Sequence, residues 1–539
     1  MSVGERYRFP LALGLLMTLA GGLRWRALSQ AHFILDGDEA VTGLMARHLI
    51  TRGEFAFFFY GQPYMAPTDA WIAAPFMAFL DGPAWVKAGP FLWSVALVGL
   101  NGWMAWLFFE SERAGVLAAL LTALPPLYFL VNDLRALGSY AITPVLGSLL
   151  FLLAYALVFR QPAPRRAAGL WFLLGLAAGF GFYAFWLIAF YYIPIAFFLL
   201  LKDKRFFMRP GFGFGLAGFG VGSLPLWWYN FETGFATFRY FAPKPGGGST
   251  PATQAFTFFL TDSLPRVIGM GPTGGVINWT LCALWIAIGF GWLMVRWRGG
   301  RSGFTRSLCE ARPVDMLLLL GVTAPVLLWA SGLIGTAFVL PGVDTTGRYL
   351  LPLMGAAPVL AGGAFARLAE WSTARRVGAR AAAAGVIGML LCHMLPYSSA
   401  DFVALFQSPY YTILRPPLDN RPVIDYLRSQ GIEYATCNHW VGNRLTLESG
   451  ETLKCVDYYD VRAGGVDRFP ALTATLREPG RRIAFVLVNP SGDPTPLEAR
   501  LHALGVDFTR RDLAPYTIII PTSRPVAPDE VVAALGYPY

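Results

Sequence analysis

Three carboxylates stand within four residues near the start of the chain, in the segment that covers residues 35–40: Asp36, Asp38 and Glu39. Asp36 and Glu39 have the spacing of a capping box, and acidic side chains favour the positive end of a helix dipole. The stretch that follows, residues 41–50, has the amphipathic pattern of a helix that lies in a membrane interface. Capping explains two of the acids but not the third. Asp38 is therefore predicted to do chemistry, as the general base for an acceptor hydroxyl.

The chain that must position these acids has the composition of a membrane protein. Of its 539 residues, 55% are hydrophobic and 14% are charged, a balance that soluble domains rarely show. The net charge of +10 arises from short basic clusters between apolar stretches and not from one basic face, so no nucleic-acid partner is expected. No P-loop and no GxGxxG after a strand is present, so a nucleotide-sugar donor in a Rossmann domain is not expected either.

Eleven apolar stretches are close to the length that spans a bilayer. They cover residues 9–23, 88–109, 114–131, 139–159, 167–184, 186–201, 211–229, 276–295, 315–338, 349–366 and 380–396. The pair within 167–201 could instead form one re-entrant unit. With the N-terminus in the cytoplasm, the Lys and Arg clusters all fall on the cytoplasmic side, as the positive-inside rule requires. The sequence thus predicts an all-α polytopic membrane protein with about 11 transmembrane helices.

An odd number of spans delivers the C-terminus to the periplasm, where the composition becomes that of a soluble domain. We predict a transmembrane domain over residues 1–398, with a first outer loop at 24–87, and a small α/β periplasmic domain over 399–539. In the latter, residues 421–430, 467–478 and 495–505 are predicted helical, and 432–438, 452–459, 482–489 and 516–520 stranded. Cys437 and Cys455 would lie on its first two strands, as a disulfide or as two buried thiols.

The segment at residues 36–49, followed by the segment at 58–65, resembles the first periplasmic loop of bacterial GT-C glycosyltransferases. These enzymes are related to the protein O-mannosyltransferases and to the transferase that adds aminoarabinose to lipid A. In that superfamily an Asp-Glu pair in this loop holds the catalytic acid, and the matching residues are Asp38 and Glu39. The chain departs from the pattern at Thr68 and Asp69, where a small residue followed by a Glu is expected.

Two further segments extend the resemblance. Residues 132–140 are similar to the second acidic site of these enzymes, with Asp133 in the place of the acid, although Asn and Asp also end helices in general. Residues 347–352 are similar to their Arg-Tyr motif, in which Arg348 would hold the phosphate of the carrier. An arginine at a membrane boundary is otherwise expected to snorkel. Arg135 and Tyr349, from the same two segments, are assigned to donor binding with Arg348.

Three residues of the first outer loop are assigned to substrate binding: Asp36, Gln62 and Tyr64. Tyr64 is equally well explained as an interfacial aromatic anchor. The segment at residues 440–450 also resembles a stretch found in the periplasmic domains of such bacterial proteins. The five histidines are scattered, so no metal cluster is indicated, although the paired acids could bind a divalent cation.

The resemblance implies a glycosyltransferase of the bacterial inner membrane that works at the periplasmic face. It would move a sugar from a polyprenyl-phosphate carrier to a hydroxyl on a glycan, lipid or protein acceptor. The alternative is a flippase or transporter of lipid-linked sugars without transfer activity. An ion-coupled carrier is disfavoured, because the predicted spans are almost free of charged residues and show no two-fold repeat.

Overall fold

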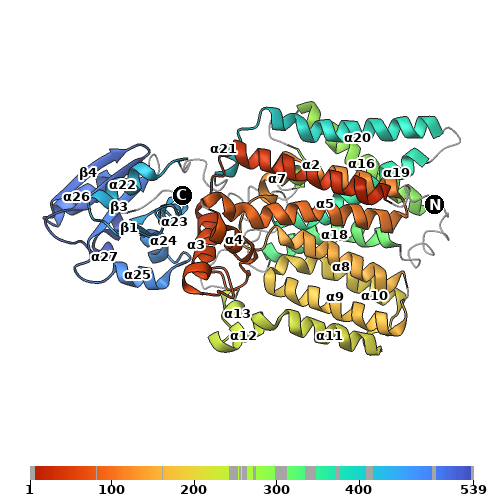
Figure 1. Ribbon diagram of the computed structural model, residues 1–539, viewed down its shortest axis with the longest axis horizontal. Helices are drawn as coiled ribbons and strands as arrows, with labels where there is room; N and C mark the ends of the chain where they lie inside the picture. The colour runs from red at the N-terminus through yellow and green to blue at the C-terminus, as the bar shows by residue number, and fades with distance from the viewer. Residues whose placement is uncertain are drawn as a thin grey trace.

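The computed structural model consists of a helical part and a smaller soluble part joined end to end (Figure 1). It describes residues 7–80, 82–160, 162–241, 264–270, 275–297, 312–333, 348–370, 375–407, 417–488 and 493–535, together with the single residues 253, 257 and 261. In Figure 1 the helical part occupies the right side and the blue soluble part the left, with α3 and α4 between them. The predicted boundary after residue 398, where α20 ends, stays a prediction.

Six helices of the described residues are long and apolar enough to cross a membrane, so the chain is a multi-pass membrane protein. They are α2 (Arg8–Gln30), the helix over Ala84–Phe109 that includes α5 (Ala88–Phe109), α9 (Pro164–Ala184), α16 (Gly275–Trp297), the helix over Arg348–Glu370 that includes α19 (Ala357–Glu370), and α20 (Arg375–Ser398). A seventh is possible if one bent pair counts as a span. The predicted count of eleven is therefore not confirmed, and residues 334–338 of one predicted span lie outside the described part.

The bent pair replaces the continuous span predicted at residues 114–131. Helix α6 (Glu112–Ala123) and helix α7 (Leu127–Asp133) meet at an angle of 77°. Pro125 and Pro126 stand between them, and a proline disfavours helical geometry in the residue before it and cannot donate a backbone hydrogen bond. Asp133 is the last residue of α7.

The remaining helices of this part are not among these six. They are α8 (Ile142–Val158), α10 (Ala189–Lys202), α11 (Pro210–Gly222), α12 (Leu224–Thr233), α13 (Ala236–Tyr240), α15 (Leu264–Val267), α18 (Pro313–Leu333) and α21 (Phe402–Phe406), with 3-10 turns at Pro83–Lys87, Trp186–Ile188, Phe206–Met208 and Arg348–Gly355. The apolar run at 167–201 forms two separate helices, α9 and α10, because Phe185 takes an extended conformation between them. One large apolar core is shared by α5, α8, α10, α18 and α19.

The soluble part is a five-stranded sheet with helices, in the strand order β2-β1-β3-β5-β4. The strands are β1 (Tyr434–Cys437), β2 (Lys454–Val456), β3 (Ile483–Val488), β4 (Phe508–Leu513) and β5 (Tyr516–Pro521), and the helices are α22 (Arg421–Ser429), α23 (His439–Glu448), α24 (Tyr458–Arg462), α25 (Pro470–Leu476), α26 (Thr495–Ala503) and α27 (Pro528–Val531), with a final 3-10 turn at Val532–Ala534. β1 lies parallel to β2 and β3, whereas β5 is antiparallel to β3 and β4. The predicted small α/β unit is thus present.

Three details of the soluble part differ from the prediction or were left open by it. Strand β4 was not predicted, because its outward residues are polar and it pairs only at the edge of the sheet. Helix α23 was not predicted either. Cys437 and Cys455 are two free, buried thiols in hydrogen-bond contact, which is the second of the two alternatives for this pair.

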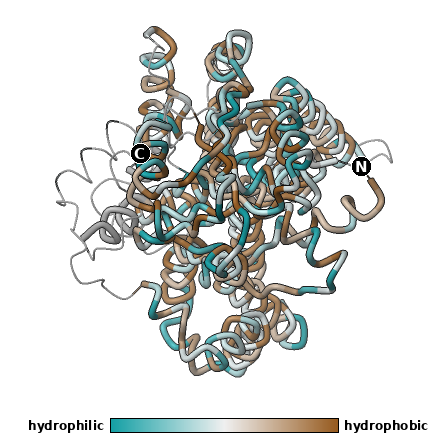
Figure 2. Tube along the Cα trace, turned by 90° about the vertical axis from the view of Figure 1, so that its left-hand side faces the viewer, coloured by the Kyte–Doolittle hydropathy of each residue, from teal (hydrophilic) through white to brown (hydrophobic). Residues whose placement is uncertain are grey.

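Helices α3 (Gly37–Arg52) and α4 (Thr68–Phe79) form the junction between the two parts. α3 packs against α4 on one side and against α23 of the soluble part on the other. The contact with α23 is close, because a Cβ atom added at Gly37 would lie 2.6 Å from the backbone oxygen of His439. Figure 2 views the molecule from the soluble end and shows hydrophilic stretches running through the side nearest the viewer. The acid cluster therefore lies where the apolar bundle meets a more polar surface.

Candidate active site

Asp36 and Glu39 form the predicted capping box at the start of α3. The Asp36 side chain accepts a hydrogen bond from the backbone N–H of Glu39 at 2.9 Å, and the Glu39 carboxylate accepts one from the backbone N–H of Asp36 at 3.1 Å. Two of the otherwise unpaired N–H groups of the first turn are satisfied in this way. The sequence thus predicted this local structure correctly.

Both capping acids also pair with cations of the helical part. Glu39 is fully buried and accepts hydrogen bonds from the Lys87 ammonium and from the backbone N–H of Ala136, the latter at 2.8 Å. Asp36 lies 3.3 Å from the guanidinium of Arg135, and both side chains are buried. Burial and the neighbouring Glu39 charge raise the pKa of Asp36 to about 6. The carboxylates of Asp36 and Glu39 are thus occupied by contacts inside the protein.

Arg135 is fixed in the same interior. Besides its ion pair with Asp36, it donates to the backbone oxygens of Leu405 and Gln407 at 2.8 and 3.0 Å. These contacts attach the residues after α7 to the segment that leads out of α21. Arg135, Asp36 and Glu39 were predicted as binding or catalytic residues, and the structure gives each of them internal partners.

Asp38 differs from its two neighbours because it faces the soluble part. Its side chain keeps 19% of its surface exposed. One carboxylate oxygen, Oδ1, accepts a hydrogen bond from Arg468 Nη2 at 2.7 Å and lies 3.1 Å from His439 Nε2. Burial opposes ionisation of this group, but the Arg468 charge and the His439 contact outweigh it, with a smaller contribution from Arg348. The pKa of Asp38 therefore lies well below its usual range, and the group is a carboxylate at any physiological pH.

The two partners of Asp38 are both residues of the soluble part. His439 is the first residue of α23, and its backbone N–H donates to the Asp457 carboxylate at 2.8 Å. Arg468 donates to the backbone oxygen of Tyr60 at 2.8 Å, and its guanidinium lies over the Phe59 ring at 5.2 Å. Sequence reasoning did not select His439 or Arg468. The only signal for this region was the resemblance of residues 440–450 to a segment of related periplasmic domains.

Arg348, predicted to hold the carrier's phosphate, lies close enough to act on Asp38. Its guanidinium lies over the rings of Tyr140 and Tyr349, at 5.2 and 5.1 Å, and donates to the Tyr349 hydroxyl at 3.2 Å. The charges of Arg348 and Arg468 both act on Asp38 and on Tyr64. The structure thus brings together four residues from distant parts of the chain.

The remaining predicted loop residues, Tyr64 and Gln62, lie in the turn between Phe59 and Met65. The Tyr64 ring packs against Tyr240 and Phe241, each with 5.0 Å between ring centroids. Gln62 forms backbone hydrogen bonds within the turn, and its side chain has no contact with Asp38 among the described residues. Tyr64 therefore lies in an aromatic cluster where the charges of Arg468 and Arg348 act on it, whereas the side chain of Gln62 is not brought into contact with the acid.

Asp133 lies in the helical part, where its carboxylate has partners other than Asp38. It accepts a hydrogen bond from the Ser94 hydroxyl and lies 3.9 Å from the Arg24 guanidinium. Arg24 also donates to the backbone oxygens of Ala123 and Thr122, next to the bend between α6 and α7. Asp133 is therefore part of the network that fixes this bend.

Asp69, the residue at which the chain departs from the related pattern, is fully buried in α4. Neither of its carboxylate oxygens has a hydrogen-bond partner among the described atoms. Burial, followed by the charges of Glu39 and Asp133, raises its pKa well above the ordinary value. Burial thus disfavours the charged form of Asp69, and no described donor reaches it.

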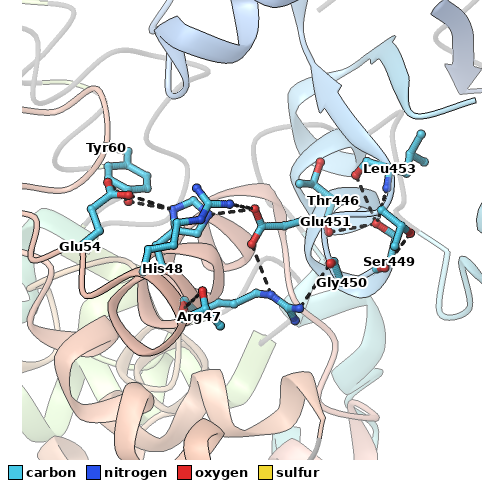
Figure 3. A network of polar contacts seen from close by, with 12 residues as sticks. Arg47, His48, Glu54, Tyr60, Thr446, Ser449, Gly450, Glu451 and Leu453 are labelled. Carbon is cyan, nitrogen blue, oxygen red and sulfur yellow. Dashed lines mark hydrogen bonds and ion pairs between the residues drawn. The ribbon is translucent and has the colours of Figure 1, made fainter.

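A second contact between α3 and the soluble part lies at the opposite end of the helix (Figure 3). The Glu451 carboxylate lies 3.3 Å from Arg47 Nε and 3.1 Å from His48 Nε2, and it also pairs with Arg52. His48 Nδ1 lies 3.0 Å from the hydroxyl of Tyr60. The soluble part therefore holds α3 at both ends. Across the described residues, no group of three or more His, Cys, Asp or Glu side chains is placed to hold a metal ion.

No protein-family model and no curated protein matches the chain, whereas solved structures do. One is the crystal structure of ArnT from Cupriavidus metallidurans bound to undecaprenyl phosphate, with a TM-score of 0.63, 14% identity and coverage of 100% of both chains. Another is the archaeal oligosaccharyltransferase AglB from Archaeoglobus fulgidus in complex with an inhibitory peptide and a dolichol-phosphate. It has a TM-score of 0.51 and 11% identity, over 99% of this chain and 78% of the other.

The chain has the GT-C fold. The match to ArnT covers both parts of the molecule, so the soluble domain belongs to the shared architecture. The resemblance stated from the acid cluster and the two further segments is thus confirmed at the level of the fold. Within this GT-C fold, Asp38 occupies the junction between the bundle and the soluble domain.

Proposed function

We propose that the protein is a membrane glycosyltransferase that moves a sugar from a polyprenyl-phosphate carrier to a hydroxyl acceptor, with Asp38 as the general base. One observation carries this proposal. Of the three clustered acids, Asp36 and Glu39 lie in buried ion pairs, whereas the Asp38 side chain stays partly exposed beside Arg468 and Arg348. The GT-C fold supports it, because the matching ArnT structure contains undecaprenyl phosphate.

The reaction assigned to this geometry needs one base and one stabilised leaving group. The acceptor oxygen forms a bond to the anomeric carbon of the sugar, and its proton passes to the Asp38 carboxylate. The bond between the anomeric carbon and the phosphate oxygen breaks, and its electron pair remains on that oxygen. Arg348, held between Tyr140 and Tyr349, supplies positive charge where this negative charge develops.

The other predicted site residues are given supporting roles. Asp36, Glu39 and Arg135 position the start of α3 through their buried pairs. Asp133 forms an ion pair with Arg24, and this pair holds the bend between α6 and α7. The aromatic surface formed by Tyr64 with its ring neighbours, and by Tyr349 at Arg348, suits the apolar face of a sugar ring. Gln62 retains its assignment as a sugar contact.

The site is assigned to the periplasmic face of a bacterial inner membrane. The positive-inside pattern of the basic clusters and the position of Asp38 immediately after the first span support this orientation. The acceptor is a hydroxyl on a glycan, a lipid or a protein. The proposal covers hexosyl and pentosyl donors alike.

The test replaces Asp38 by Asn in the full-length protein. Loss of a general base typically reduces the rate about 100-fold to 10,000-fold, so we expect transfer to fall by that amount. Mass spectrometry of envelope glycans from a deletion strain that carries the wild type or Asp38→Asn measures this loss. Glu451→Gln is the matched control, because it removes one carboxylate from the other end of the same interface. We expect the control to restore the glycans.

Two outcomes would contradict the proposal at different levels. If Asp38→Asn restores parental glycans, Asp38 is not the base. If the deletion leaves every envelope glycan unchanged and the purified protein moves lipid-linked sugar without transferring it, the activity is that of a flippase. Binding of undecaprenyl phosphate by Asp38→Asn shows that the variant is folded.

A further inference from the structure

Arg468 has an incomplete set of hydrogen bonds for a buried cation. Its side chain is 8% exposed, and two of its nitrogens have partners: Nη2 donates to Asp38 and Nη1 to the backbone oxygen of Tyr60. The Nε atom is buried and has no partner among the described atoms. Buried donors without an acceptor are rare in native proteins, and each requires an explanation. A missing acceptor at this position is one such explanation.

The position of Arg468 indicates the kind of acceptor. The guanidinium is held flat over the Phe59 ring, and its charge acts on Asp38, Tyr64 and Tyr240. Arg348 acts on the first two of these residues as well. The charges of two arginines therefore act on the general base. The planar fork of a guanidinium matches the oxygens of a phosphate group better than those of a neutral ligand.

We propose that Arg468, which belongs to the soluble domain, is a second phosphate-binding residue of the active site and exchanges its ion pair with Asp38 for the donor's phosphate. This inference rests on the proposed function. It assigns to the soluble domain a direct contact with the lipid-linked donor. Arg348 of the helical part supplies the first cation for the phosphate, and Arg468 of the soluble domain supplies the second.

The exchange links donor binding to the strength of the base. Without donor, Asp38 is held by Arg468 and His439. Once phosphate oxygens share the Arg468 guanidinium, its attraction for Asp38 weakens, and the carboxylate becomes a better proton acceptor. His439 keeps its contact with Oδ1 and preserves the orientation of the group. The phosphodiester of the donor carries one negative charge, and the departing phosphate gains a second one, which both arginines stabilise.

The competing explanation is that Arg468 only fastens the soluble domain to the first outer loop. The Glu451 cluster does so at the other end of α3, and its ion pairs do not include Asp38. A variant of each cluster therefore separates the two explanations. Arg468→Gln and Glu451→Gln both remove one charge from the same interface, but only the first removes a proposed phosphate ligand.

The experiment measures undecaprenyl phosphate binding to the full-length protein in nanodiscs. We expect Arg468→Gln to weaken binding about 10-fold to 100-fold, as the loss of a charge-assisted hydrogen bond does. Arg468→Lys keeps the charge without the fork and should lose less. Glu451→Gln should bind within about twofold of the wild type, since it has no proposed ligand contact. Inorganic phosphate should compete with the lipid in the wild type and compete less well in Arg468→Gln.

Wild-type affinity in both Arg468 variants, or unchanged competition by inorganic phosphate in Arg468→Gln, would overturn the inference and leave Arg468 as a docking residue. Arg348→Gln separates this failure from that of the proposed function. If Arg348→Gln loses binding while Arg468→Gln keeps it, only the inference about Arg468 is wrong. If the wild type binds no undecaprenyl phosphate, the proposed function itself is wrong. Should Arg468→Gln not fold, Arg468→Lys provides the same comparison.

Discussion

The acids on the two sides of α3 differ in their partners and in their exposure. Toward the transmembrane helices, Glu39 pairs with Lys87, and both side chains are at most 2% exposed. Toward the soluble domain, Asp38 pairs with Arg468 and remains 19% exposed. The two acids are adjacent in the sequence and lie on the same turn of helix. The partner that the fold supplies, and the water that it admits, therefore decide which acid is structural and which is available for chemistry.

This difference has an energetic basis. Breaking a buried ion pair by removing one partner leaves an uncompensated charge in a medium that solvates it poorly, which typically costs about 3 to 5 kcal/mol. The Glu39 pair is therefore fixed. A partly exposed pair is weaker and can be replaced by a competing anion, because water and the incoming ligand compensate the separated charges. The Asp38 pair has the properties that a site with exchanging partners needs.

The strongest test of this comparison is Glu39→Gln. The substitution leaves the Lys87 ammonium buried without its counter-charge, and we expect the free energy of unfolding to fall by about 3 to 5 kcal/mol. Thermal unfolding of the purified protein measures this loss. Adding Lys87→Met should recover part of the stability, because the unpaired charge is removed. A Glu39→Gln protein that unfolds like the wild type but transfers no sugar would show that Glu39 is catalytic, and the contrast between the two sides would disappear.

The sequence predicted the local features of this junction well. The capping box, the surface helix behind it and the surplus acid were all visible within residues 36–50, because capping and helical periodicity are short-range properties. The resemblance in the same segment predicted the GT-C fold. What the sequence could not indicate was which side of α3 each acid would face.

The partners of Asp38 were missed because nothing local marks them. His439 and Arg468 lie 401 and 430 residues further along the chain than Asp38. His439 was counted only among scattered histidines. Helix α23 was missed because it is buried on several sides, between α3 and the sheet, so its apolar residues do not form a one-sided stripe. The bend between α6 and α7 likewise interrupts an apolar run whose composition resembles a straight span.

A smaller effect is expected where the soluble domain approaches α3 most closely. A Cβ atom at Gly37 would lie 2.6 Å from the backbone oxygen of His439 and 2.7 Å from the Cα of Trp440. Because these atoms belong to the backbone, Gly37→Ala should displace α23 and cost about 3 kcal/mol, the upper end for overpacking. It should also slow sugar transfer, because His439 moves away from Asp38. Thermal unfolding and the glycan assay measure the two effects.

Gly43→Ala is the matched control for this substitution on the same helix. Its Cβ would meet the ends of the Leu447 and Val86 side chains, at 2.6 and 2.9 Å, and these can rotate aside more easily than a backbone can shift. We therefore expect a smaller loss of stability and near-normal transfer. Equal effects of the two substitutions would mean that the position of α23 against the start of α3 is not critical for the acid.

The smallest effect concerns the pH dependence of the soluble side. Asp457, which accepts the backbone N–H of His439, has its pKa raised to about 6, mainly by burial. A carboxyl with a raised folded-state pKa stabilises the protein below its unfolded pKa, and this contribution is lost as pH rises toward about 6. Relative to Asp457→Asn, the wild type should therefore lose about 2 kcal/mol of stability between about pH 4 and about pH 7. Relative to Asp419→Asn, the wild type should change little over the same range, because hydrogen bonds from Arg421 lower the pKa of Asp419 to about 2 and its contribution is lost only below about pH 4. Thermal unfolding of the three proteins at both pH values measures these differences. If the difference in unfolding free energy between the wild type and Asp457→Asn does not change with pH, Asp457 is ionised throughout and His439 donates to a permanent carboxylate.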